Sequence, residues 1–109
     1  QDLVNRGEIF LFIQEDCEAC EKALSEAARC APETRNKVNL VALESESWAL
    51  KKSVSSMVVK MSPRSFYSMT RAEAKKLGVI GTPTFLSRHV KIMKELKCSE
   101  IKNLIREAN

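Results

Sequence analysis

Hydrophobic and polar positions along this chain follow two periods, which predict alternating strands and helices. The continuous apolar run Ile9–Ile13 lies inside a predicted buried strand at 8–14. The next stretch, 17–30, is rich in Ala, Glu, Leu and Lys, all good helix formers. We expect Asp16 to cap this helix and Pro32 to end it. The first third of the chain is therefore predicted to form a strand followed by a helix.

The remaining pattern predicts three more strands and three more helical segments. They are a strand at 38–43, a helix from Trp48 to Met61 that Pro63 breaks, a helix that begins at Ser68 or Thr70 and ends at Leu77, strands at 83–87 and 90–93, and a helix capped by Ser99. Gly78 is suited to the left-handed turn that follows a helix. This order, without linker or repeat, predicts one α/β domain spanning 1–109.

Length and charge narrow the class of protein. The chain has 109 residues, of which 44% are hydrophobic, enough for one modest core. Residues 1–50 carry five basic and ten acidic side chains, and residues 51–109 carry thirteen and four. Because the basic residues are spread over helices with few aromatic residues among them, we interpret them as a solvated face and expect no nucleic-acid partner. No apolar run approaches the ~20 residues of a membrane span.

The four cysteines carry the candidate chemistry, above all the pair in Cys17-Glu18-Ala19-Cys20. This pair follows a predicted buried strand and opens a predicted helix. A helix N-terminus favours the thiolate, which is the form that attacks disulfides. Cys17 lies at that terminus near solvent, and Cys20 lies one turn on, facing inward. The pattern therefore predicts Cys17 as the nucleophile and Cys20 as the resolving thiol.

Two other interpretations of the pair are weaker. A structural zinc site needs four ligands, usually as two close pairs, but Cys30 and Cys98 are isolated and His89 is the sole histidine. A purely structural Cys17–Cys20 bridge closes so short a loop that it would restrict the unfolded chain little. We therefore expect a redox pair, with no metal and no cofactor.

At two segments the sequence resembles the thioredoxin superfamily: Ile9 to Cys20, and Leu77-Gly78-Val79-Ile80-Gly81-Thr82-Pro83-Thr84-Phe85. The resemblance implies a thioredoxin-like fold, in which helices flank a central mixed four-stranded sheet. It matches Cys17 to the attacking cysteine and Cys20 to the resolving one. It also matches Pro83 to the family's cis-proline, and Thr82 to the residue whose backbone binds an extended substrate peptide. Without it, Gly81-Thr82-Pro83 is simply a turn that enters a strand.

The chain departs from thioredoxins proper at several positions. Asp16 stands where they carry tryptophan, Glu18-Ala19 replaces their Gly-Pro, and Leu11 stands where they have a buried acid. A threonine before the cis-proline is more like bacterial periplasmic disulfide isomerases and glutaredoxins. These departures leave the direction of the reaction open.

Acidic residues surround Cys17 in the sequence: Glu15, Asp16, Glu18 and Glu21. Negative neighbours disfavour the thiolate and oppose the helix terminus. We therefore expect the pKa of the Cys17 thiol to lie above that of a strongly oxidising enzyme. The disulfide should be correspondingly harder to reduce.

These features predict a thiol–disulfide oxidoreductase that acts on protein disulfides, with reduction or isomerisation favoured over oxidation. Its expected partners are protein thiols and disulfides and a redox partner protein, and the expected state is a monomer. The alternative is a redox-inactive binding module that holds a partner through the Thr82-Pro83 face. The start at Gln1 and the threonine before Pro83 favour an exported, periplasmic protein over a cytoplasmic one.

Three further expectations concern the other singled-out side chains. In a thioredoxin fold the first and last helices run roughly parallel, so the end of one is far from the start of the other. Cys30 and Cys98 should then lie beyond the ~7 Å limit for a bridge, each as a free thiol or small hydrophobe. His89 is expected to be an exposed turn residue. Core packing is expected for Trp48, Phe66 and Tyr67, with a partner-binding surface as the alternative.

Overall fold

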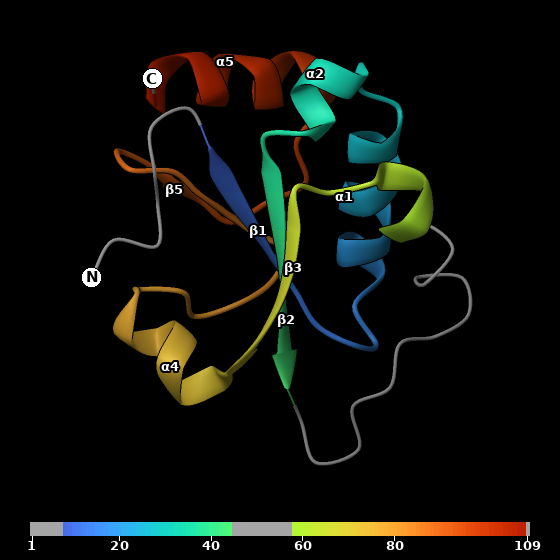
Figure 1. Ribbon diagram of the computed structural model, residues 1–109. Helices are drawn as coiled ribbons and strands as arrows, with labels where there is room; N and C mark the ends of the chain where they lie inside the picture. Colours follow the sequence, from blue (N-terminus) through green and yellow to red (C-terminus); the bar gives the residue numbers. More distant parts are fainter. Residues whose placement is uncertain (1–7, 45–57, 109) are drawn as a thin grey trace.

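A mixed five-stranded sheet forms the centre of the molecule in the computed structural model, which describes residues 8–44 and 58–108 (Figure 1). The strands are β1 (Ile9–Ile13), β2 (Val38–Glu44), β3 (Ser65–Thr70), β4 (Thr84–Leu86) and β5 (Lys91–Ile92). They lie in the order β3-β2-β1-β4-β5, with β1, β2 and β3 parallel and β4 and β5 each antiparallel to its neighbour. The α/β class is confirmed, but the predicted number of four strands is wrong.

The strand that the sequence analysis missed is β3, at the edge of the sheet. It pairs with β2 over its whole length, so that Tyr67 lies opposite Val41. Phe66 and Tyr67 are each 45% exposed, so the expected core packing is wrong for Phe66. It holds in part for Tyr67, whose ring stacks on the buried Phe10 ring with centroids 6.0 Å apart. The backbone ladder to a buried neighbour holds this strand, so its sequence needs no continuous apolar face. Trp48 lies outside the described residues.

Four helices have bounds within the described residues: α1 (Glu18–Ala28), α2 (Pro32–Arg35), α4 (Arg71–Lys76) and α5 (Cys98–Ala108). Residues 58–61 are also helical, and the rest of the helix predicted from Trp48 lies outside the described residues. Pro32 does not end α1 but opens α2 at its first position, where a missing N–H costs nothing. The last helix begins one residue before Ser99, so Ser99 is not its cap.

Alternate residues of β1 build two cores on opposite faces of the sheet. Ile9, Leu11 and Ile13 belong to one cluster, which also holds residues of α1 and α5. Phe10 and Phe12 belong to the other, to which α4 contributes Ala74. Because both faces are covered, all five residues of β1 are buried. The predicted buried strand is confirmed, and α1 packs on one of its two covered faces.

Helix α4 has well-formed ends. The Thr70 hydroxyl accepts a hydrogen bond from the Glu73 backbone N–H, and the Glu73 carboxylate accepts one from the Thr70 N–H, which completes a capping box. These hydrogen bonds hold the pKa of Glu73 below its usual value. Gly78 follows Leu77, the C-cap residue, with a φ of +84°, so its predicted left-handed turn is confirmed. Together the two caps define where α4 begins and ends, and thus where the segment that leads into β4 starts.

A second disulfide joins Cys30 to Cys98, against our expectation that the two are far apart. Figure 1 shows the reason: α5 crosses the end of α1 instead of running beside it, so the start of α5 lies next to the last turn of α1. The two Cα atoms are 5.5 Å apart, within the range for a bridge. Cys30 is buried and Cys98 is half-buried. The prediction of two unbridged cysteines is therefore wrong.

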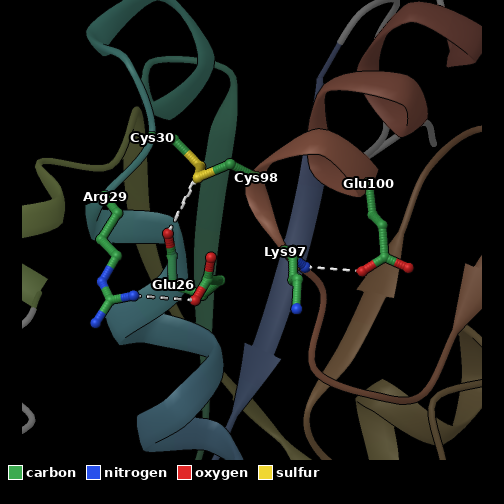
Figure 2. A network of polar contacts seen from close by, with 6 residues as sticks. All are labelled: Glu26, Arg29, Cys30, Lys97, Cys98 and Glu100. Atoms are coloured by element: carbon green, nitrogen blue, oxygen red, sulfur yellow. Dashed lines mark hydrogen bonds and ion pairs between the residues drawn. A yellow bond between two sulfur atoms is a disulfide. The ribbon is translucent and has the colours of Figure 1, made fainter.

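The contacts around this disulfide fix the ends of both helices (Figure 2). The Cys98 sulfur lies 3.2 Å from the Glu26 carbonyl oxygen, in the last turns of α1. The Glu100 carboxylate accepts a hydrogen bond from the Lys97 backbone N–H at 2.9 Å, which closes the first turn of α5 and lowers the pKa of Glu100. The ion pair between Arg29 and Glu26 is exposed and contributes little. Because that pair lies within the end of α1, the Cys30–Cys98 disulfide is the covalent link between the two helices, in addition to their shared apolar core.

His89 is exposed in the turn between β4 and β5, where its backbone N–H donates to the Ser87 hydroxyl, so the predicted turn residue is confirmed. Within the described residues, no helix has the length and apolar character needed to cross a bilayer.

Candidate active site

The disulfide between Cys17 and Cys20 lies where β1 passes into α1. Between β1 and α1 the chain turns sharply at Asp16, which has a φ of +53°. Asp is one of the few residues that adopt this left-handed conformation readily. Cys17, with an extended backbone, takes the capping position. The prediction that Asp16 caps this helix is therefore wrong.

The Cys17 sulfur acts as the cap of α1. It accepts a hydrogen bond from the Cys20 backbone N–H at 3.1 Å. The same role usually belongs to the oxygen of Ser, Thr, Asp or Asn, which satisfies an unpaired N–H of the first turn. The positive end of the helix therefore points at this sulfur. Because a helix N-terminus favours the thiolate form of a cysteine, we expect this arrangement to favour the Cys17 thiolate after reduction.

The two sulfurs differ in their access to solvent. Cys17 is half-buried, whereas Cys20 is 2% exposed and packs in the core with Ala23 and Leu24. An incoming thiol or disulfide therefore meets Cys17 first. This asymmetry supports the predicted division into an attacking and a resolving cysteine.

The loop before β4 brings Thr82 and Pro83 to the disulfide. The Thr82 hydroxyl lies 3.7 Å from the Cys17 sulfur, and the Thr82 carbonyl oxygen lies 3.8 Å from it. Pro83 is buried, and its bond to Thr82 is cis. The Thr84 hydroxyl donates to the Gly81 carbonyl at 2.6 Å and braces the loop. Two segments 65 residues apart thus meet at one sulfur, while their role in substrate binding stays a prediction.

The surroundings of the pair differ from those of an acid-assisted site. Leu11 is fully buried and belongs to the same core cluster as Cys20, so this position offers no carboxyl group for proton transfer. Asp16 and Glu18 are exposed, and Glu15 and Glu21 are half-buried. A disulfide does not titrate, so the pKa of the Cys17 thiol stays a prediction.

Within the described residues, no group of three or more His, Cys, Asp or Glu side chains is placed to hold a metal ion. All four cysteines are paired in the two disulfides.

A groove of about 420 Å³ adjoins the loop that carries Thr82, and the sequence analysis did not anticipate it. Its lining joins Leu43 at the end of β2 to Arg71 on α4 and to Ile80 in the following loop. The only signal for it in the sequence is Ile80, which follows Val79 soon after a helix that carries Arg71 and Lys75 four residues apart.

Comparison with protein-family models gives no match, and comparison with curated protein sequences gives no significant match. The case for this site therefore rests on the positions of its own residues.

Proposed function

We propose that this protein is a thioredoxin-like thiol–disulfide oxidoreductase that acts on protein substrates through Cys17 and Cys20. One observation carries the proposal: the accessible sulfur of the pair caps α1 and lies beside Thr82, while its partner is buried. An exposed sulfur that is stabilised as an anion and backed by a second thiol is what disulfide exchange requires.

The proposed reaction begins with the reduced pair. The Cys17 thiolate attacks one sulfur of a substrate disulfide, a new S–S bond forms, and the other substrate sulfur leaves as a thiolate that takes up a proton. Cys20 then loses its proton and attacks the Cys17 sulfur, which releases the substrate as a thiol and restores the Cys17–Cys20 disulfide. Two electrons pass from the pair to the substrate.

Proton transfer in the second step must proceed without a buried acid at Leu11, which lies in the apolar core. The departing substrate thiolate and water can accept the Cys20 proton in its place. Acidic residues close to Cys17 in sequence disfavour an accumulated thiolate, which favours reduction or isomerisation over oxidation. In this proposal the backbone and hydroxyl of Thr82, which lie beside the Cys17 sulfur, bind the substrate segment next to the attacked sulfur.

Trapping the covalent intermediate tests this proposal. Reduced protein carrying Cys20→Ala is expected to accumulate a mixed disulfide with insulin, because no second thiol remains to resolve it. Mass spectrometry of the alkylated, non-reduced digest should locate the bond at Cys17. The matched variant Cys17→Ala should form no such adduct. Equal adduct from both variants, or none from either, contradicts the proposal, and none from either favours the redox-inactive binding module.

We further propose that the protein works in an oxidising compartment such as the bacterial periplasm. The second disulfide supports this, since Cys30 and Cys98 lie away from the exchange site and their bond ties two helices together. Bonds of this kind persist where thiols are not kept reduced.

A further inference from the structure

The groove beside the candidate active site combines an apolar floor with a charged wall. Leu43 and Val79 are buried at its floor, and Ile80 is 78% exposed at its rim. Arg71 and Lys75, both exposed, come from one side of α4. Concave sites that combine apolar walls with a few placed charged groups are typical of ligand-binding surfaces.

The groove adjoins the loop that reaches the site of exchange. Its lining includes Gly81, which is bonded to Thr82, the residue in contact with the Cys17 sulfur. It also includes Gln14, three residues before Cys17. The residues that flank a sulfur bonded to Cys17 would therefore lie close to this groove.

The charges on α4 indicate the chemistry of the occupant. Arg71 and Lys75 are four residues apart and thus on the same side of the helix, where like charges repel. Neither forms an ion pair with any residue in the described ranges, whereas Lys76 lies close enough to Glu73 to lower the pKa of that carboxyl. An anion between the first two cations would relieve their repulsion.

We propose that this groove binds the segment of a substrate protein that flanks the exchanging cysteine, and that it selects an aliphatic side chain next to an acidic one. The aliphatic group packs on Ile80 and the floor, and the carboxylate lies between Arg71 and Lys75. This inference rests on the proposed function and adds the substrate class to it.

Three synthetic peptides test the selection. Each has two cysteines closed by an intramolecular disulfide, and both cysteines carry the same flanking pair: Leu-Glu, Leu-Lys or Ser-Glu. The second-order rate constant for reduction by the reduced protein is measured by acid quench, alkylation and mass spectrometry. Division by the rate constant for dithiothreitol removes differences in intrinsic disulfide reactivity. The Leu-Glu peptide should react about tenfold faster than the Leu-Lys peptide.

Reversing the two charges of the groove tests whether Arg71 and Lys75 cause the preference for the acidic peptide. Arg71→Glu combined with Lys75→Glu should abolish or invert the ratio between the Leu-Glu and Leu-Lys peptides. A control with the same change of charge, Lys102→Glu with Arg106→Glu on exposed positions of α5, should keep the tenfold ratio. Arg71→Glu places an acid in the first turn of α4, where the helix dipole favours it, whereas Lys75→Glu places one in the last turn, where the dipole disfavours it. Urea unfolding and circular dichroism of the double variant therefore check that the fold and α4 are retained.

A second variant tests the apolar part independently. Ile80→Ser changes a side chain that is 78% exposed, so the fold should tolerate it. The preference for the Leu-Glu over the Ser-Glu peptide should then fall toward one. If all peptides are reduced but neither variant changes the ratios of their rate constants, the groove does not select the substrate segment. The proposed function is not contradicted by that result. If no peptide is reduced at all, the proposed function fails and this inference fails with it.

Discussion

Replacement of Cys17 by serine should lower the rate of insulin reduction, with dithiothreitol as electron donor, by about 10³-fold or more. A serine hydroxyl is not ionised at neutral pH and forms no S–S bond, so the first step of the exchange is lost. The hydrogen bond that Cys17 accepts from the Cys20 N–H needs only a small acceptor, and serine is a good helix cap. The fold should therefore survive the change.

Cys20→Ser is the informative comparison for this prediction. It should also stop multiple turnover, yet it should leave the first attack intact, so that one equivalent of mixed disulfide forms per chain. Urea unfolding of both variants shows whether either loss comes from misfolding. Turnover by Cys17→Ser within threefold of the unchanged protein would contradict the assignment of Cys17 as the nucleophile.

Removal of the second disulfide should have the largest effect on stability. Cys30 and Cys98 are 68 residues apart in sequence, so their bond restricts a long loop of the unfolded chain. The loop-entropy relation predicts that Cys30→Ala with Cys98→Ala lowers the free energy of unfolding by about 4 kcal/mol. The bond also fixes the start of α5 against the last turns of α1, so α5 should be the first element to fray.

The other disulfide provides a matched control for that measurement. Cys17→Ala with Cys20→Ala also removes one disulfide, but the two residues are only three apart, so the expected loss is about 2 kcal/mol. Urea unfolding of the two double variants compares the losses directly. Equal losses, or a smaller loss without the Cys30–Cys98 bond, would show that the long-loop bond is not the main staple of the fold.

Local patterns were enough to predict the parts of the molecule that depend on local sequence. The run Ile9–Ile13 could be recognised as a strand because both faces of β1 are buried, which leaves no polar position to break the pattern. The helix after Cys17 followed from its composition. The position of the cysteine pair at the strand-to-helix junction followed from these two elements together.

The features that were missed depend on contacts distant in sequence. β3 is an edge strand held by backbone bonds to β2, so its side chains carry little trace of it. The Cys30–Cys98 bond depends on how α5 crosses α1, which periodicity does not encode. The groove arises only where Leu43 and Ile80 are brought together by the sheet and the loop. The capping role of Cys17 depends on the left-handed turn at Asp16, which an N-cap preference alone does not predict.

The reduction potential of the Cys17–Cys20 pair tests the central claim most directly. The protein is equilibrated in glutathione buffers of known poise, quenched with acid and alkylated, and the labelled cysteines are located by mass spectrometry. If the pair is a working redox site, Cys17 and Cys20 should titrate together with a potential between about −270 and −120 mV, nearer the lower value because of their acidic neighbours. A potential below about −300 mV, typical of structural disulfides, would contradict the account.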